Sequence, residues 1–231
     1  KVDGGKGGLG GAVQLRAPRN IANNDLAIAA INSVISGARA IRVEGYKSYP
    51  DSTITSSDFA TSGDLYKDAA SFMKQTGAIR SRLKMAGNST FALAPGIDIE
   101  SAADLTLSND WSLAAWRYDP DYDPINDPNN VGPVVTDITQ LASGLNAKGK
   151  ALSAGVLTLR AAGNLKLDSS LSDGFDTTLA TGAAQGLNAW SYRLVAGAEL
   201  GANPLTVKKG VGNITLANSK LFRTGRGDID I

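Results

Sequence analysis

Two stretches of the chain repeat each other and decide the fold that the sequence predicts. Residues 97–107 read IDIESAADLTL and residues 157–167 read LTLRAAGNLKL, which align without a gap at an offset of 60 positions. Each copy holds two apolar-x-apolar triplets around a corner of small residues with Asp104 or Asn164. Because side chains alternate between the faces of a strand, each triplet predicts a very short strand with its apolar residues on one face.

Strands of three residues need similar strands stacked above and below them, as in solenoid proteins. Echoes of the triplet occur at residues 40–44, 213–216 and 228–231. A coil of about 20 residues lies at the lower end of the range for solenoid repeats, so the offset predicts three coils. The sequence therefore predicts an all-β fold, a right-handed parallel β-helix (a solenoid).

Two segments interrupt this pattern. In residues 51–86, Leu65, Ala69 and Phe72 have helical spacing, and Asp64 or Ser62 is available as the N-cap. We therefore predict a helical insertion of one or two helices there.

The second interruption is rich in proline and aspartate, and it predicts a long irregular excursion at residues 118–154. The coils then occupy residues 1–50, 87–117 and 155–231 of one continuous solenoid domain. Within the first of these ranges, residues 22–37 fit either a helix or a coil, and we favour the coil.

Composition excludes several classes of function. The chain has 231 residues with 23 basic and 22 acidic side chains, so bulk charge does not indicate a nucleic-acid partner. Its longest apolar run is far shorter than the roughly 20 residues of a membrane helix, so we expect no membrane insertion. The absence of Cys and His removes disulfides, thiolate metal sites and Ser-His-Asp machinery. Such a composition is compatible with an extracellular structural protein.

Several motifs resemble a known family. Residues 155–165 (GVLTLRAAGNL), residues 170–175 (SLSDGF) and residues 223–231 (RTGRGDIDI) are similar to the large filamentous-haemagglutinin-like exoproteins. The resemblance covers most of the chain outside residues 51–86 and 119–150, and it is most specific between residues 157 and 175.

This resemblance implies secretion by a Gram-negative bacterium through an outer-membrane partner (two-partner secretion) and a place at the cell surface. It implies virulence-related adhesion, biofilm formation, or a stalk that presents a toxin to neighbouring cells. The chain lacks the secretion domain of the family, so we expect an internal segment of a longer exoprotein. Its expected partner is a receptor or glycan on a host or bacterial cell. The alternative is a carbohydrate-binding or polysaccharide-degrading protein of the same shape.

Acidic residues at the start of the excursion form a candidate metal site. Asp119, Asp121 and Asp123 alternate along the chain, and Asp127 follows them. Clustered carboxylates are the ligands that Ca²⁺ prefers, although the residues that follow do not complete an EF-hand. The sequence leaves open a Ca²⁺ site or a solvated acidic loop.

Residues Arg226, Gly227 and Asp228 spell a tripeptide that some adhesins offer to integrins. Recognition would require a protruding loop that displays the arginine and the aspartate together. The alternative is that Asp228 is a corner residue that precedes a triplet, in the manner of Asp104 and Asn164.

No residue set predicts catalysis. Paired carboxylates at Asp98 and Glu100, or at Asp168 and Asp173, have a spacing that a glycosidase would use. However, nothing orients a base, and alternation predicts an ordinary solvated surface for Asp98 and Glu100. We therefore expect no enzymatic activity and no cofactor apart from the candidate Ca²⁺.

Three tryptophans are the large anchors of the chain. Trp111 and Trp116 precede the excursion, and Trp190 follows it. We expect them to pack the excursion or a helix onto a solenoid face, and a sugar-stacking platform is the alternative.

Overall fold

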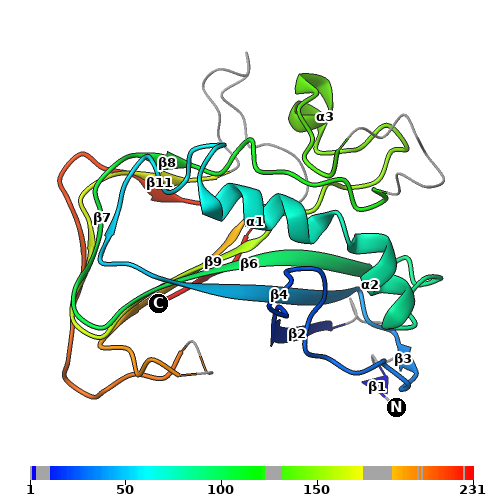
Figure 1. Ribbon diagram of the computed structural model, residues 1–231, viewed down its shortest axis with the longest axis horizontal. Helices are drawn as coiled ribbons and strands as arrows, with labels where there is room; N and C mark the ends of the chain where they lie inside the picture. Colours follow the sequence, from blue (N-terminus) through cyan, green and yellow to red (C-terminus); the bar gives the residue numbers. More distant parts are fainter. Residues whose placement is uncertain are drawn as a thin grey trace.

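Three parallel sheets form the framework of the protein (Figure 1). The structure is a computed structural model that describes residues 2–3, 11–122, 132–173, 189–201, 203, 205–225 and 227–231. The six-stranded sheet contains β2 (Ala12–Pro18), β4 (Ala40–Pro50), β6 (Phe91–Ser101), β9 (Val156–Ala161), β12 (Ser191–Ala196) and β15 (Ile229–Asp230). The four-stranded sheet contains β5 (Thr53–Ile54), β7 (Leu105–Leu107), β10 (Leu165–Leu167) and β13 (Ile214–Leu216). The three-stranded sheet contains β8 (Trp111–Ser112), β11 (Leu171–Ser172) and β14 (Phe222–Arg223), and a separate pair contains β1 (Val2–Asp3) and β3 (Ile35–Ser36).

The chain visits the three sheets in turn. It passes from β6 to β7 and β8, and the next visit runs through β9, β10 and β11. Ile97 pairs with Leu157, and Leu105 pairs with Leu165. The two copies of the repeated stretch are therefore direct neighbours. The offset of 60 positions spans one circuit of the chain, and the prediction that it spans three coils is wrong.

The described residues also form the helices α1 (Asp64–Met73), α2 (Thr76–Arg82) and α3 (Ile138–Ser143). The first two confirm the helices predicted within residues 51–86. The predicted caps are wrong, because Gly63 occupies the N-cap of α1 and no side chain caps it. Residues 22–37 contain no helix, in agreement with the favoured interpretation, although only β3 is a regular strand there.

Helix α1 lies against the sheets and closes the core. Figure 1 shows α1 between the six-stranded sheet and the strands β8 and β11. Its buried face carries Leu65, Ala69 and Phe72, and the Phe72 ring lies against Gly45 of β4. The absence of a side chain at Gly45 allows this close approach, since a Cβ there would lie 2.3 Å from the ring.

The predicted fold class, an all-β right-handed parallel β-helix with an irregular excursion, is wrong. The fold is mixed, because α1 and α2 share one core with the sheets and the excursion contains α3. The six-stranded sheet curls into a half-barrel. Its strands are parallel, as expected, but a right-handed β-helix is not shown.

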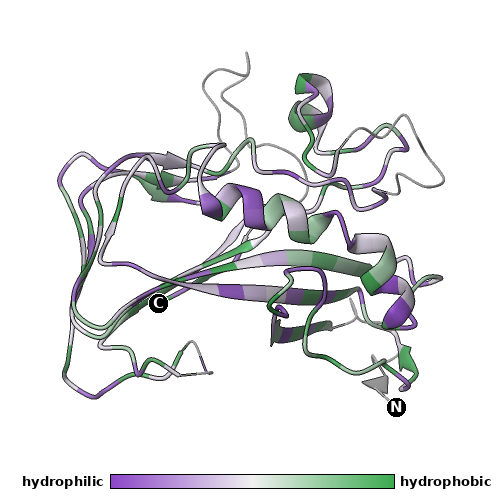
Figure 2. Ribbon diagram, viewed as in Figure 1, coloured by the Kyte–Doolittle hydropathy of each residue, from purple (hydrophilic) through white to green (hydrophobic). Residues whose placement is uncertain are grey.

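The inner face of the six-stranded sheet is apolar. Ile97, Leu157 and Tyr192 pair across three neighbouring strands, and each side chain is fully buried. Figure 2 shows hydrophobic and hydrophilic residues alternating along β4 of the same sheet. This alternation follows from the two-residue period of a strand, and it builds the core from one of the two sets.

The tryptophans pack inside this core. Trp111 stacks on Phe59 with ring centroids 4.9 Å apart, and Trp116 meets the edge of Tyr66 on α1 at 5.1 Å. Trp190 lies 6.1 Å from Trp116. Trp116 therefore packs helix α1 onto the sheets, whereas Trp111 and Trp190 have aromatic partners outside the helices. Because all three are buried, they do not form a platform for sugars.

Polar residues form a ladder at the corner before the four-stranded sheet. The backbone N and Nδ2 of Asn164 donate to Oδ1 of Asp104 at 2.8 and 3.1 Å. Asn213 donates in the same way to Oδ1 of Asn164 at 3.0 and 3.3 Å. Asp228 is not a member of this ladder, since it precedes β15 in the six-stranded sheet. The interpretation of Asp228 as an equivalent corner is therefore wrong.

Candidate functional site

The face of the six-stranded sheet that lies opposite the core carries a network of charged side chains. Its members are Arg16, Glu44, Asp98, Glu100, Arg160 and Arg193, which we call the ion-pair network. Asp98 is 0% exposed and Arg160 is 2% exposed. The prediction that Asp98 belongs to an ordinary solvated surface is therefore wrong.

Each carboxylate of the network contacts at least one arginine. Asp98 accepts from Arg16 at 2.7 Å and from Nε and Nη2 of Arg160 at 2.9 and 3.0 Å. Glu44 accepts from Arg16 at 3.1 Å and from Arg193 at 2.8 Å. Glu100 accepts from Arg160 at 2.6 Å. Hydrogen-bonded pairing of this kind is what allows charges to remain buried.

The curl of the sheet brings these residues together. Glu44 lies on β4 and Arg193 lies on β12, with β6 and β9 between them in the sheet. On a flat sheet, three strand spacings would separate the two backbones by about 14 Å. The 2.8 Å contact between the side chains therefore requires the sheet to be concave on this face.

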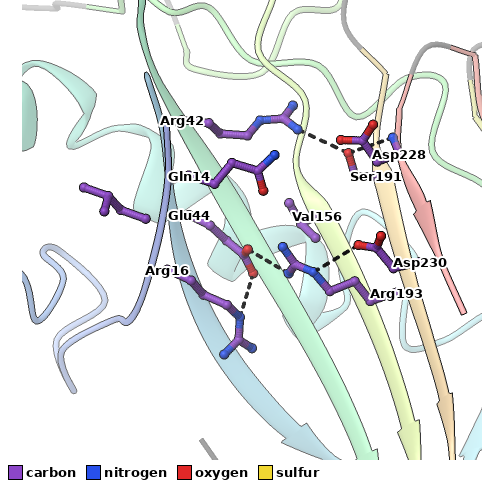
Figure 3. A pocket seen from close by; sticks show the side chains of 10 residues that line it. Gln14, Arg16, Arg42, Glu44, Val156, Ser191, Arg193, Asp228 and Asp230 are labelled. Atoms are coloured by element: carbon purple, nitrogen blue, oxygen red, sulfur yellow. Dashed lines mark hydrogen bonds and ion pairs between the residues drawn. The ribbon is translucent and has the colours of Figure 1, made fainter. Parts of the chain in front are cut away.

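A pocket opens beside the network on this concave face (Figure 3). Its volume is about 230 Å³. Besides network members, the lining includes Gln14 from β2, Arg42 from β4, Ser191 from β12, and Asp228 and Asp230 next to and within β15. Side chains from both edges of the sheet thus converge on one space, which we call the concave pocket.

Among the three arginines that line the concave pocket, Arg42 has no carboxylate partner within the described chain. Its side chain donates to Oγ of Ser191 at 3.2 Å, and no described carboxylate lies within ion-pair distance. Burial lowers the pKa of Arg42, whereas the nearby charges of Asp228 and Glu44 raise it. Figure 3 shows the guanidinium extending toward Ser191 and Asp228.

Sequence reasoning missed this site, although one signal was present. The gapless alignment of the two repeated stretches places Arg160 opposite Glu100, and the structure confirms that pair. Opposite charges at paired positions of neighbouring strands attract each other. That signal identifies a charged ladder, but it does not reveal the contacts that skip strands.

The carboxylate pairs considered for catalysis are not assembled as an acid and a base. Asp98 and Glu100 both bind Arg160. Asp173 is fully buried, where it accepts from Arg117 at 2.6 Å, whereas Asp168 is exposed. Asp98, Glu100 and Asp173 are thus each paired with an arginine.

The candidate Ca²⁺ ligands lie only partly within the described residues. Asp119 accepts from the Asp121 backbone N at 2.9 Å and from Asn146 at 2.8 Å. Lys150 binds Asp121 at 2.8 Å. Asp123 and Asp127 lie outside the described residues. In the part of the chain that the structure describes, no group of three or more acidic residues is placed to hold a metal ion. The Ca²⁺ site stays a prediction.

The residues of the integrin tripeptide also lie only partly within the described chain. Arg226 lies outside the described residues, and Asp228 donates its backbone N–H to Oγ of Ser191 at 3.2 Å. Gly227 packs against the carbonyl of Trp190, where a Cβ would lie 1.9 Å from the oxygen. Integrin recognition stays a prediction.

Two other cavities are less specific in their chemistry. One of about 350 Å³ lies beside α1, but its Asp51 and Asp58 accept hydrogen bonds from the backbone of their own loop. The other, of about 640 Å³, is lined mostly by apolar residues such as Leu194 and Ile229 near the C-terminal strands. Neither cavity combines buried charge with side chains from several strands.

Comparison with protein-family models, curated proteins and solved structures gave no match. The resemblance to filamentous-haemagglutinin-like exoproteins therefore stays a prediction. The helices of the described chain are not long and apolar enough to cross a membrane.

Proposed function

We propose that this chain is a structural and adhesive segment of a secreted bacterial surface exoprotein. Its stacked sheets would act as a spacer, and its lateral surface would contact a receptor or glycan on a host or bacterial cell. Export through an outer-membrane secretion partner, and a use in contact-dependent toxin delivery, are parts of the proposal that rest on the sequence resemblance.

The observation that carries the proposal is the in-register stacking of like residues. Leu165 pairs with Leu105 on one side and with Ile214 on the other, in parallel strands. Asn213 continues the hydrogen-bonded corner ladder of the preceding layers. Layers that draw stability mainly from their neighbours form extended structures, which suits a spacer.

No catalytic activity is part of the proposal. The carboxylates that would serve a polysaccharide-cleaving enzyme bind arginines instead of a reacting group, as at Asp98 and Asp173. The alternative function, a carbohydrate-binding protein, gains support from the polar concave pocket.

Retention of coated beads on cell surfaces tests the adhesive function. Beads that carry the folded chain should stay on host or bacterial cells under flow more often than beads that carry heat-unfolded chain. Equal retention of the two bead types would contradict the proposal. Release of reducing ends from a polysaccharide panel would instead favour the enzymatic alternative.

A further inference from the structure

Arg42 differs from the other arginines of the concave face. Arg16 and Arg160 each bind two carboxylates, and Arg193 binds Glu44 at 2.8 Å and lies 3.7 Å from Asp230. Arg42 donates to a neutral hydroxyl alone among the described residues. A guanidinium has five N–H donors, and the Arg42 guanidinium has no hydrogen-bonded carboxylate among the described residues, although the charges of Asp228 and Glu44 lie nearby. The pocket therefore has a place for an anionic group next to Arg42.

The other polar groups around Arg42 suit hydroxyl groups. Asp228 is exposed at the pocket, and its carboxylate has no hydrogen bond or ion pair within the described chain. Ser191 accepts hydrogen bonds from Arg42 and from the Asp228 backbone, so its own O–H remains available as a donor. A carboxylate that accepts and a hydroxyl that donates are the groups with which proteins orient a polyol.

The charge of the pocket limits the charge of its ligand. Its lining combines three arginines, namely Arg16, Arg42 and Arg193, with the three carboxylates of Glu44, Asp228 and Asp230. A dianionic phosphate would approach those carboxylates and be repelled by them. A single carboxylate fits better, because its planar pair of oxygens matches the guanidinium fork.

The size of the pocket limits the size of its ligand. Sites for drug-sized molecules have volumes of roughly 300–1,000 Å³. The concave pocket, at about 230 Å³, is smaller and fits a single sugar ring.

We propose that the concave pocket binds a uronic acid residue, with its carboxylate on the Arg42 guanidinium and its hydroxyls on Asp228 and Ser191. The ligand would be an acidic monosaccharide unit of a surface or capsular polysaccharide. This inference deepens the adhesive function proposed above, and it rests on that function for its biological use.

Titration of the purified chain with free sugars tests the inference. Glucuronate is the probe, glucose is the neutral analogue of the same ring, and acetate supplies the carboxylate alone. Binding is followed by saturation-transfer NMR. We expect saturable binding of glucuronate, with glucose and acetate each weaker by about tenfold or more, which corresponds to about 1.4 kcal/mol.

Substitutions at two arginines of the same segment locate the site. Arg42→Gln should weaken glucuronate binding by about tenfold while leaving the residual binding equal to that of glucose. Arg42→Lys keeps the positive charge but loses the paired N–H donors of the guanidinium, so this variant should bind glucuronate with intermediate affinity. The matched control is Arg39→Gln, because Arg39 is exposed just before β4 and does not line the pocket. Circular dichroism confirms that each variant is folded.

Several outcomes would overturn the inference. They are equal affinity for glucuronate and glucose, tighter binding of glucose 6-phosphate than of glucuronate, no saturable binding of glucuronate by the folded chain, or an equal loss in the Arg39→Gln control. The bead assay is independent of this titration. Bead retention without glucuronate binding would reject the sugar site alone, and glucuronate binding without retention would reject the adhesive function.

Discussion

The two faces of the six-stranded sheet bury opposite kinds of residue. On the inner face Ile97 and Leu157 pair inside the apolar core, and one position further along the same strands Asp98 pairs with Thr158 on the concave face. All four side chains have 0% exposure. The inner face is covered by α1 and the other sheets, whereas the concave face is closed by the curl of its own sheet and by its long side chains. The alternation of side chains along a strand thus decides on which face a residue lies. The curvature of the sheet decides whether that face is exposed to solvent.

The faces also differ in what holds them together. Burial of apolar surface stabilises the fold by roughly 25 cal/mol per Å². Truncation of a buried apolar side chain loses this contribution and leaves a cavity. Buried ion pairs add little net stability, but removal of one partner leaves an uncompensated charge. The concave face should therefore be the more sensitive of the two to a single substitution.

The largest effect is expected for Asp98→Ala. The substitution removes the pair between Arg16 and Asp98 and two of the contacts of Arg160. Breaking a buried pair should lower the free energy of unfolding by about 3–5 kcal/mol, measured by urea denaturation. Asp168→Ala is the control, because Asp168 is exposed, and it should change that free energy by about 0.5 kcal/mol at most. Similar losses in both variants would mean that the network is not buried.

A smaller effect is expected on the inner face for Gly45→Ala. The added Cβ would lie 2.3 Å from Cζ of Phe72, so α1 must move away from β4. Overpacking of this kind should lower the free energy of unfolding by about 1–3 kcal/mol. In the double variant with Phe72→Leu the two losses should not add, because the smaller side chain relieves the clash. Gly87→Ala, which has open space around it, is the control. Additive losses would contradict the close packing of α1 on the sheet.

The sequence was sufficient for parallel pairing and for the helices in residues 51–86. Both signals are local: a triplet has a two-residue period, and Leu65, Ala69 and Phe72 have a helical one. The number of coils could not be obtained in that way. Ile97 pairs with Leu157, but Leu157 pairs with Tyr192 after a much shorter stretch of chain. Because the excursion at residues 118–154 lengthens one circuit alone, the offset of the best-matched repeat is not the period of the fold.

The candidate site was out of reach for a related reason. Arg42 meets Ser191 and Glu44 meets Arg193 only because the sheet curls over four neighbouring strands. The curvature of a sheet depends on the packing of all its strands, and no pattern of residues at a fixed spacing in the sequence predicts it. The alternating pattern that correctly predicts an apolar core therefore predicts a solvated surface where the protein has a buried network and a pocket.

The smallest effect is expected at the corner, which belongs to neither face. Hydrogen bonds from Lys166, and then from the backbone and side chain of Asn164, lower the pKa of Asp104 to about 2. An aspartate in an unfolded chain titrates near 3.9, so the unfolded state takes up a proton first as the pH falls. The stabilising contribution of Asp104 is therefore fully present above pH 5 or so and is lost as the pH falls toward about 2. Asp104→Ala should lower stability slightly at pH 7, and the difference from the original chain should shrink at acidic pH. NMR titration of the carboxyl carbon measures the pKa directly. A midpoint near 3.9 would show that the corner ladder does not hold Asp104, and that the layers are joined by their strands alone.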